Sequence, residues 1–343
     1  MLLRERMLSN VPLLEVLQPS DIPTLETLTL GIAPDFRQRC LAIGNNEAIA
    51  SNQGVAAEIC HLLSALPLRN DPESHMLAAN PDDAAHDGYF RMRRIKGDAP
   101  WIFLRTILRT RWSLLREVDE GPVSILPSRL DAIDRALSDL MCCALGAPPG
   151  REARIIRWKT RGRERLPMQR WVRGHQIFVA LTQGLIFSFQ EIAVRAGRED
   201  DLELGGFVDL AITLLGGCAA ALEFTGDFPP QDYTDIIRPS MRPPFVSETF
   251  SGLLSIDHRH FVKTLRELKP ALDFVRNRDT PRHDRLGQAV SAVYESHKFV
   301  CERFVGNLPS LRLEASCTKS GVEQLEHFRT LRMKAFEAGC PKA

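Results

Sequence analysis

The sequence lacks an excess of charge of either sign. Its 44 Lys and Arg residues balance 43 Asp and Glu residues, so the formal net charge of the 343-residue chain is +1. No overall electrostatic field therefore favours binding to nucleic acid or to an anionic membrane surface, and we expect neither as a partner. The function must be sought in a local site.

The sequence also lacks any Cys-x-x-Cys pair. Its eight cysteines are scattered, which excludes a zinc ribbon and the sequence that usually attaches c-type haem. A cytoplasmic chain would keep them reduced, and most are expected to be small core residues. Cys301 is the exception that we set apart, for the reason given below.

Long hydrophobic runs are absent as well. The most apolar stretch, Leu210–Leu222, is shorter than the roughly 18 residues that a membrane span requires. It contains Gly216 and Gly217, and we interpret it as a buried core helix. The charged first turn, residues 1–8, is followed by no apolar stretch of the signal-peptide type. We therefore expect a cytoplasmic protein with no membrane segment.

Apolar residues recur with helical spacing in most of the long segments, whereas alternating runs of strand length are scarce. This pattern predicts an all-α fold, a helical bundle. The expected helices cover about residues 55–65, 101–117, 127–145, 169–196, 204–223, 258–276, 282–305 and 319–338.

Two segments do not fit the helical pattern. Residues 67–88 are rich in Asn, Asp, Pro and Ala, which predicts a long loop. That loop divides an N-terminal helical extension, residues 1–90, from a main helical domain, residues 91–343, unless the two form one continuous domain. Residues 227–252 contain five prolines, so no helix is expected to run through them.

The first candidate site element is the pair His297 and Cys301. Their i, i+4 spacing places an imidazole and a thiol one turn apart on the same helix face. A histidine and a cysteine four residues apart also occur often by chance. The alternative interpretation is therefore a core cysteine beside a boundary histidine.

The second element is the segment of residues 257–260, Asp-His-Arg-His, at the start of the preceding helix. An inward-facing His258 can offer a neutral imidazole nitrogen to iron, as haem proteins require. The alternative is that both histidines are surface residues, which is the better interpretation for His260.

The third element is the proline-rich loop before His258, which supplies Arg238 and Arg242. Guanidinium groups pair bidentately with carboxylates, so these side chains suit haem propionates or a substrate carboxylate. Plain surface charge is the alternative.

The order of these residues, His258 and then His297-x-x-x-Cys301, resembles the motif of the haem-dependent tyrosine hydroxylases of bacterial antibiotic pathways, relatives of tryptophan 2,3-dioxygenase. The resemblance covers about residues 165–305. It implies a tryptophan-dioxygenase-like bundle that encloses haem within a catalytic domain. It further implies that His258 is the permanent axial ligand of the iron, that His297 is a second, displaceable ligand, and that Cys301 attaches the haem covalently through a thioether.

Within this family, the pattern is most similar to the branch that hydroxylates 3-methyl-L-tyrosine for saframycin- and safracin-type antibiotics. The resemblance implies a peroxygenase that uses hydrogen peroxide to hydroxylate L-tyrosine or 3-methyl-L-tyrosine ortho to the phenol hydroxyl, giving a catechol. Three alternatives stay open: a tryptophan or indole dioxygenase-like haem enzyme, a bis-histidine haem carrier or sensor, and a helical interaction protein without a cofactor. The oligomeric state is also open, with a homodimer as one option.

Residues 174–187 look like the substrate-pocket helix of the tryptophan dioxygenases. The likeness places Phe178 against the substrate ring and Thr182 where those enzymes carry a distal histidine. His175 is then a candidate substitute acid or base, and a displaced His297 is expected to move protons. The expected substrate-binding residues are Phe178, Tyr233 and Ser251.

Overall fold

In the computed structural model, the described residues are 8, 10–44, 51–66, 80–148, 158, 166–198, 201–246, 250, 255–306 and 320–337. These residues are mostly helical, which confirms the all-α expectation. A short pair of parallel strands, β1 (Leu14–Val16) and β2 (Met92–Arg94), joins the N-terminal segment to the start of the bundle.

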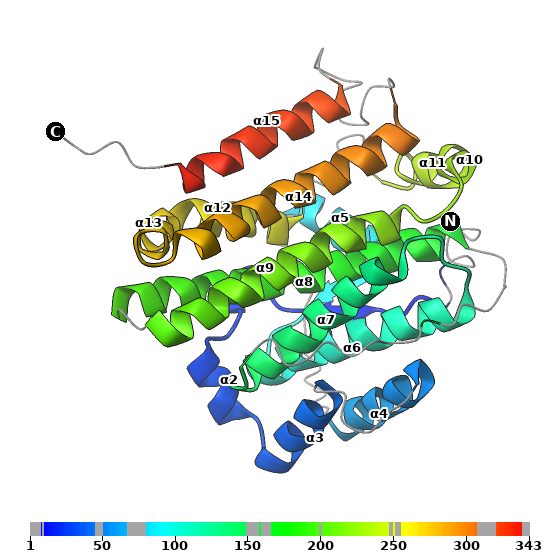
Figure 1. Cartoon of the computed structure of the whole chain (residues 1–343). Coiled ribbons are helices and arrows are strands. Elements are labelled where there is room, and N and C mark those ends of the chain that lie inside the picture. The colour runs from blue at the N-terminus through cyan, green and yellow to red at the C-terminus, as the bar shows by residue number, and fades with distance from the viewer. Residues whose placement is uncertain are drawn as a thin grey trace.

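The centre of the bundle is the pair α8 (Pro167–Arg198) and α9 (Asp201–Thr225), as Figure 1 shows. On one side, α14 (Thr280–Phe304) packs along α9. On the other side, α7 (Pro127–Ala144) packs along α9 and α6 (Ala99–Glu120) packs on α7 and α8. The two central helices are thus enclosed from both faces.

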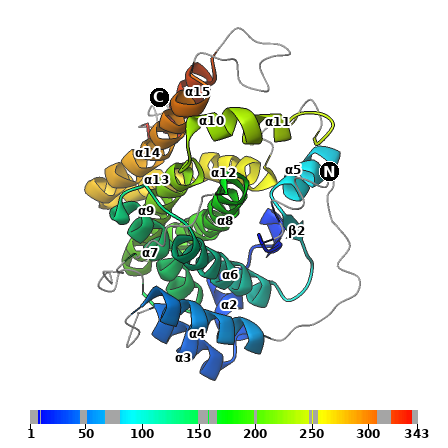
Figure 2. The ribbon, with the colours of Figure 1, turned by 90° about the vertical axis from the view of Figure 1, so that its right-hand side faces the viewer.

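A further layer lies outside each face (Figure 2). On the α14 side, α15 (Gly321–Met333) packs on α14, while α12 (Ile256–Glu267) and α13 (Lys269–Arg278) pack on α8. On the opposite side, α3 (Pro34–Gly44) and α4 (Asn52–Ala65) pack on α7 and α6. The remaining short elements are α2 (Leu25–Gly31), which packs on α6 and α7, η1 (Pro19–Asp21), which contacts α12, and η4 (Lys334–Phe336), which contacts α13 and α15. One hydrophobic cluster contains both Leu17 and Leu325, so residues on either side of position 90 share a core.

Small residues allow the central helices to approach closely. A Cβ added at Gly217 of α9 would lie 2.5 Å from the Cβ of Ala136 on α7. A Cβ added at Gly184 of α8 would lie 2.6 Å from a side-chain carbon of Leu140 on the same helix α7. Alanine at Gly217 would therefore force α9 away from α7, because the Cβ of Ala136 cannot move aside, whereas alanine at Gly184 would require the Leu140 side chain to shift.

Two helices have the length and hydropathy of membrane spans, contrary to the expectation that no stretch would be long enough. They are Pro167–Arg198 and Glu203–Thr225. In their most apolar windows, 78% and 67% of the residues are buried inside the structure. Burial to this extent is typical of helices at the centre of a large bundle.

The helix expected over residues 258–276 is divided into α12 and α13 at Leu268. Pro270 follows at once, at the second position of α13. Its ring and its missing N–H are tolerated in the first turn of a helix but not in an interior. The apolar periodicity continues across the break, which is why the sequence pattern did not reveal it.

Part of the segment expected as a loop is a helix, α5 (Pro81–Tyr89), so the loop prediction is wrong for residues 80–88. The Asn80 side chain accepts a hydrogen bond from the Asp82 backbone N at 3.0 Å, and Pro81 occupies the first turn. These are standard start signals, which the polar composition of the segment masked. Residues 67–79 lie outside the described part of the chain.

The prediction that no helix runs through residues 227–252 is also wrong in part. Helical backbone extends over α10 (Pro230–Asp232), the π-helical turn η2 (Tyr233–Ile237) and α11 (Arg238–Ser240). Pro230 stands at the first helical position, where no N–H is needed. The π turn changes the hydrogen-bond spacing just before Pro239, so the helical path continues past a second proline.

Candidate functional site

A cavity lies between α8, α9, α12, α14 and α15. The space between its walls amounts to about 1030 Å³, including the part that is open to solvent. Most of the walls are apolar, and four histidines contribute nitrogen atoms: His86, His175, His258 and His297.

His258 and His297 face this cavity from different helices. His258 lies in the first turn of α12, and His297 lies in the last third of α14. Burial lowers the pKa of His258 to about 4, with further contributions from Arg332, His297 and Arg259. Burial lowers the pKa of His297 to about 4 as well. Both imidazoles are therefore neutral at pH 7, and each keeps a nitrogen lone pair for a metal.

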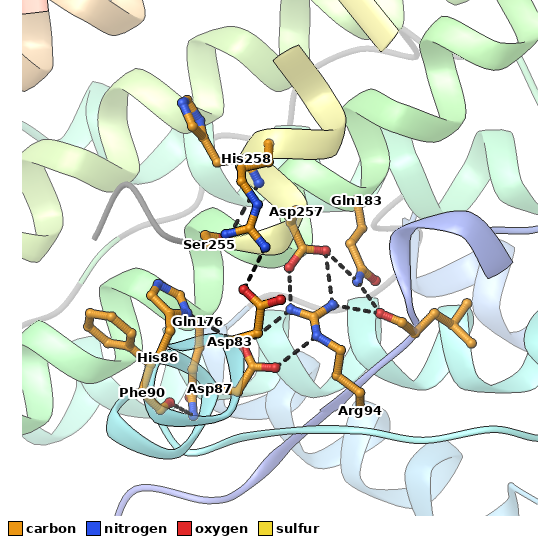
Figure 3. A network of polar contacts seen from close by, with 12 residues as sticks. Asp83, His86, Asp87, Phe90, Arg94, Gln176, Gln183, Ser255, Asp257 and His258 are labelled. Carbon is orange, nitrogen blue, oxygen red and sulfur yellow. Dashed lines mark hydrogen bonds and ion pairs between the residues drawn. The ribbon is translucent and has the colours of Figure 1, made fainter. Parts of the chain in front are cut away.

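A buried ionic network anchors the start of α12 (Figure 3). The Arg94 guanidinium donates to Asp257 at 2.5 and 3.3 Å and to Asp87 at 2.8 and 3.2 Å. Gln183 of α8 donates to the same Asp257 carboxylate at 2.9 Å. Asp257 is fully buried, so its charge depends on these partners.

The network fixes the position of the His258 backbone, and so the point from which its side chain extends. Asp257 is the residue immediately before His258, and it is held by β2 through Arg94 and by α8 through Gln183. The Ser255 hydroxyl caps the same helix by accepting from the His258 backbone N at 3.4 Å. The first turn of α12 is thus fixed by contacts on both sides of the histidine.

The structure places the three residues that the sequence analysis named on α8 in one cavity. His175, Phe178 and Thr182 all line it. The His175 Nδ1 lies 2.7 Å from the Trp171 carbonyl, which can only accept, so Nδ1 carries the hydrogen and Nε2 keeps its lone pair. Its ring stacks on Phe90 at 4.0 Å between centroids, and burial lowers its pKa to about 3.

The hydroxyl hydrogen of Thr182 is already used in a hydrogen bond. Its hydroxyl already donates to the Phe178 carbonyl at 2.8 Å. Toward a ligand, this hydroxyl can therefore act as an acceptor only.

His86 is a cavity residue that the sequence did not reveal. It is 2% exposed, and its Nδ1 lies 3.5 Å from an Asp87 carboxylate oxygen. Burial alone would raise the pKa of Asp87, but the hydrogen bonds and charges of His86 and Arg94 outweigh burial and lower it. The sequence feature that could have revealed His86 is the helix start at Asn80 and Pro81, because a helix that begins there places His86 in an ordered element rather than a loop.

Cys301 lies one turn beyond His297 on α14, and it is half-buried. It is not among the described residues that line the cavity. Burial, together with Glu302, raises the pKa of its thiol to about 11, so the thiol is protonated at pH 7. Another cysteine, Cys218 of α9, does line the cavity.

Tyr233, Arg238 and Arg242 gather near Cys301 rather than in the cavity wall. Burial raises the pKa of Tyr233, whereas the charges of Arg238 and Arg242 and a hydrogen bond from Arg238 lower it, and Cys301 also acts on it. Arg238 is buried, and Arg242 is exposed. Ser251, the remaining predicted site residue, lies outside the described residues.

The described ranges contain no group of three or more His, Cys, Asp and Glu side chains that could hold a metal ion. Two neutral histidines are, however, the axial ligands that haem accepts from a protein, since the porphyrin supplies the other four nitrogens. The donor set of the cavity thus suits a metal in a macrocycle better than a bare ion.

Comparison with known proteins gives three matches. A family model described as SfmD 3-methyl-L-tyrosine peroxygenase matches residues 15–288. A 3-methyl-L-tyrosine peroxygenase of Streptomyces lavendulae is 32% identical over 170 residues, which is 49% of this chain and 47% of that protein. The alignment therefore spans about half the length of the curated relative.

The third match is the crystal structure of reduced SfmD soaked with sodium hydrosulfite. It superposes with a TM-score of 0.70 at 22% identity, over 84% of this chain and 96% of that one. At this identity, the likeness shows that the helical fold is shared.

Proposed function

Because the chain belongs to the SfmD 3-methyl-L-tyrosine peroxygenase family, we propose that it is a haem-dependent peroxygenase that hydroxylates L-tyrosine or 3-methyl-L-tyrosine. The observation that carries this proposal is the pair of neutral histidines, His258 and His297, that face one largely apolar cavity. Hydrogen peroxide is the proposed oxidant. The product is a catechol amino acid for antibiotic biosynthesis, made in the cytoplasm.

The cavity fits haem in three respects. Its apolar walls, which include Leu185, Leu215 and Val290, suit a porphyrin face. Its two low-pKa histidines offer lone pairs from α12 and from α14. The Arg94–Asp257 pair fixes the helix turn that carries His258. In metal sites, neighbouring polar residues orient the ligating histidines in a comparable way.

Cys301 is the proposed covalent anchor, through a thioether to a haem vinyl group. Its position one turn beyond His297 keeps the thiol close to a ligand that shares its helix. The nearby Arg238 and Arg242 are proposed to pair with propionates at the same end of the site, since both act electrostatically on Tyr233 together with Cys301.

Haem bound between the histidines would supply the activation of peroxide and the transfer of oxygen to the ring. In the balanced reaction, one oxygen atom of hydrogen peroxide replaces a ring hydrogen as a hydroxyl group, and the other leaves as water. His258 would be the permanent ligand of the iron, and His297 the displaceable one. The protein contributes position, ligation and exclusion of water.

The chain offers several groups that can move the protons of this reaction. His86 is the best supported, because Asp87 can hold its Nδ1 hydrogen and leave Nε2 as the acceptor. His175 keeps its Nε2 lone pair, Thr182 can accept only, and a displaced His297 is a third imidazole in the same cavity. A base near the phenol hydroxyl would activate the ortho carbon.

Phe178 is proposed to contact the aromatic ring of the substrate, because its side chain lines the cavity next to the imidazoles. Tyr233 and Ser251 remain proposals from the sequence. Tyr233 is 5% exposed and stacks on Phe304 at 4.8 Å between centroids, so it would have to act from behind the cavity wall.

The deciding experiment is an optical spectrum and an intact mass of the purified, haem-replete protein, followed by incubation with hydrogen peroxide and 3-methyl-L-tyrosine. We expect a Soret band, a mass increase of one haem that survives denaturation, and a product heavier by one oxygen atom. A colourless protein of bare-chain mass would overturn the proposal.

Cys218→Ala is the matched control for Cys301→Ala, because Cys218 is the cysteine that lines the cavity. Loss of the denaturation-resistant haem mass in Cys301→Ala alone supports the proposed anchor. Loss in Cys218→Ala alone would move the anchor to α9.

A further inference from the structure

The helix α15 contributes one wall of the cavity. Leu325 and Phe328 line it, and Leu325 is 4% exposed. In Figure 1, α15 lies along the outer side of α14, and it begins beyond the last residue that the family model matches, residue 288. Like His297 and Cys301, it lies outside the residues that the family model matches.

Arg332 lies one turn beyond Phe328 on this helix. Its guanidinium carbon is 5.5 Å from the centroid of the Phe328 ring. Its charge contributes, after burial, to the low pKa of His258. Its charge and hydrogen bonding also lower the pKa of the Tyr294 hydroxyl, although burial raises that pKa overall. Phe328, His258 and Tyr294 all line the cavity. Arg332 is not itself among the lining residues, but its guanidinium packs against Phe328 of that wall.

This guanidinium lacks an anionic partner among the described residues. Arg332 is half-buried, its Nε is buried without a hydrogen-bond partner, and no described carboxylate forms an ion pair with it. Arg329, one turn earlier on α15, differs in this respect. It donates to Glu326 at 3.0 Å and to Ser291 at 3.2 Å.

A half-buried arginine that makes no ion pair keeps its guanidinium available to pair with an anionic ligand. A guanidinium fork binds a carboxylate through two parallel hydrogen bonds. Arg332 also adjoins Tyr294, whose hydroxyl can donate to the same anion.

We propose that Arg332 binds a carboxylate of the ligand in the cavity, beside His258. This inference rests on the proposed function, which offers two such carboxylates: a haem propionate and the α-carboxylate of the amino-acid substrate. A guanidinium would bind either carboxylate through the same hydrogen bonds, and the experiment below distinguishes the propionate from the substrate carboxylate.

The test compares Arg332→Gln with Arg329→Gln, a matched change on the same helix, in both the wild-type and the Cys301→Ala background. In the Cys301→Ala background, the rate of haem transfer to excess apomyoglobin reports the propionate contact. In the wild-type background, optical titrations with 3-methyl-L-tyrosine and with its decarboxylated amine report the substrate contact. Circular dichroism checks that each variant is folded.

A substrate contact predicts that Arg332→Gln raises the Kd of the amino acid roughly 10- to 100-fold and leaves the Kd of the amine unchanged. A propionate contact predicts haem transfer that is faster by about 10-fold or more. Either result supports the proposal. Equal behaviour of the two glutamine variants in every measurement would overturn it while leaving the proposed function intact. A wild-type protein that binds neither haem nor amino acid would overturn both.

Discussion

Arg94 and Asp257 form a fully enclosed ion pair, in which Nη2 donates to Oδ2 at 2.5 Å, and the next residue along the chain is His258. The pair connects a short edge strand to the first turn of α12. Asp87 completes the network from α5, next to His86. Two cavity histidines thus depend on the same arginine for the placement of their backbone.

Arg94→Met is expected to destabilise the protein by about 3–5 kcal/mol, because it leaves two buried carboxylates without their cation. Arg93→Met is the control, since Arg93 pairs with Glu15 through a side chain that is 40% exposed. That variant should lose less than about 1 kcal/mol. Urea unfolding of the two variants measures the difference, and equal losses would contradict the role assigned to Arg94.

Acid should destabilise the cofactor-free protein partly through His175. Its folded-state pKa of about 3 lies below the ordinary histidine pKa of 6.5, so the unfolded chain binds the proton first as the pH falls. The stabilisation is complete above pH 6.5 and is lost toward pH 3, with about 2 kcal/mol lost by pH 5. Urea unfolding at pH 7 and pH 5 should show a smaller pH effect in His175→Gln, whereas His61→Gln, at an exposed position, should behave as wild type.

His86→Asn is expected to lower kcat for hydroxylation roughly 100- to 10,000-fold, since it removes a group that can move a proton in the cavity. The haem content and the Soret band should stay unchanged, because His86 is not a proposed ligand. His260→Asn is the control, because the half-buried His260 on the same part of the fold does not line the cavity. Full activity of His86→Asn in steady-state assays would remove His86 from the mechanism.

Gly217→Ala and Gly216→Ala should change stability in opposite directions. The Cβ added at Gly217 would lie 2.5 Å from that of Ala136, whereas nothing lies within 4 Å of one added at Gly216. We expect a loss of about 1–3 kcal/mol at Gly217 and a gain of up to about 1 kcal/mol at Gly216. Thermal unfolding followed by circular dichroism distinguishes them. Equal melting temperatures would show that α7 and α9 can separate without loss.

The long helices and the α8, α12 and α14 positions of the cavity could be predicted from the sequence. Apolar periodicity places His258 and His297 on helices, and the structure brings them to one cavity. The α5 wall could not be found in this way, because a short helix with acidic first-turn residues resembles a polar loop in composition. His86 was missed for that reason.

Contacts between distant segments were equally hidden. Arg94 and Asp257 are 163 residues apart, and no local pattern relates them. Arg332 looks like any basic residue near the end of a helix, and its isolation from carboxylates emerges only once α15 is docked on α14. Pairing across the chain depends on tertiary packing, which periodicity does not encode.

The order of the walls along the chain has a consequence for biosynthesis. The α5 wall is made early and the α15 wall last, so a nascent chain folded through α14 would present the histidine cavity with one side uncovered. A rigid, flat cofactor could enter through that side during translation, and the docking of α15 would then close it in. Supply of the cofactor during expression, rather than after purification, should accordingly govern how much of it the protein retains.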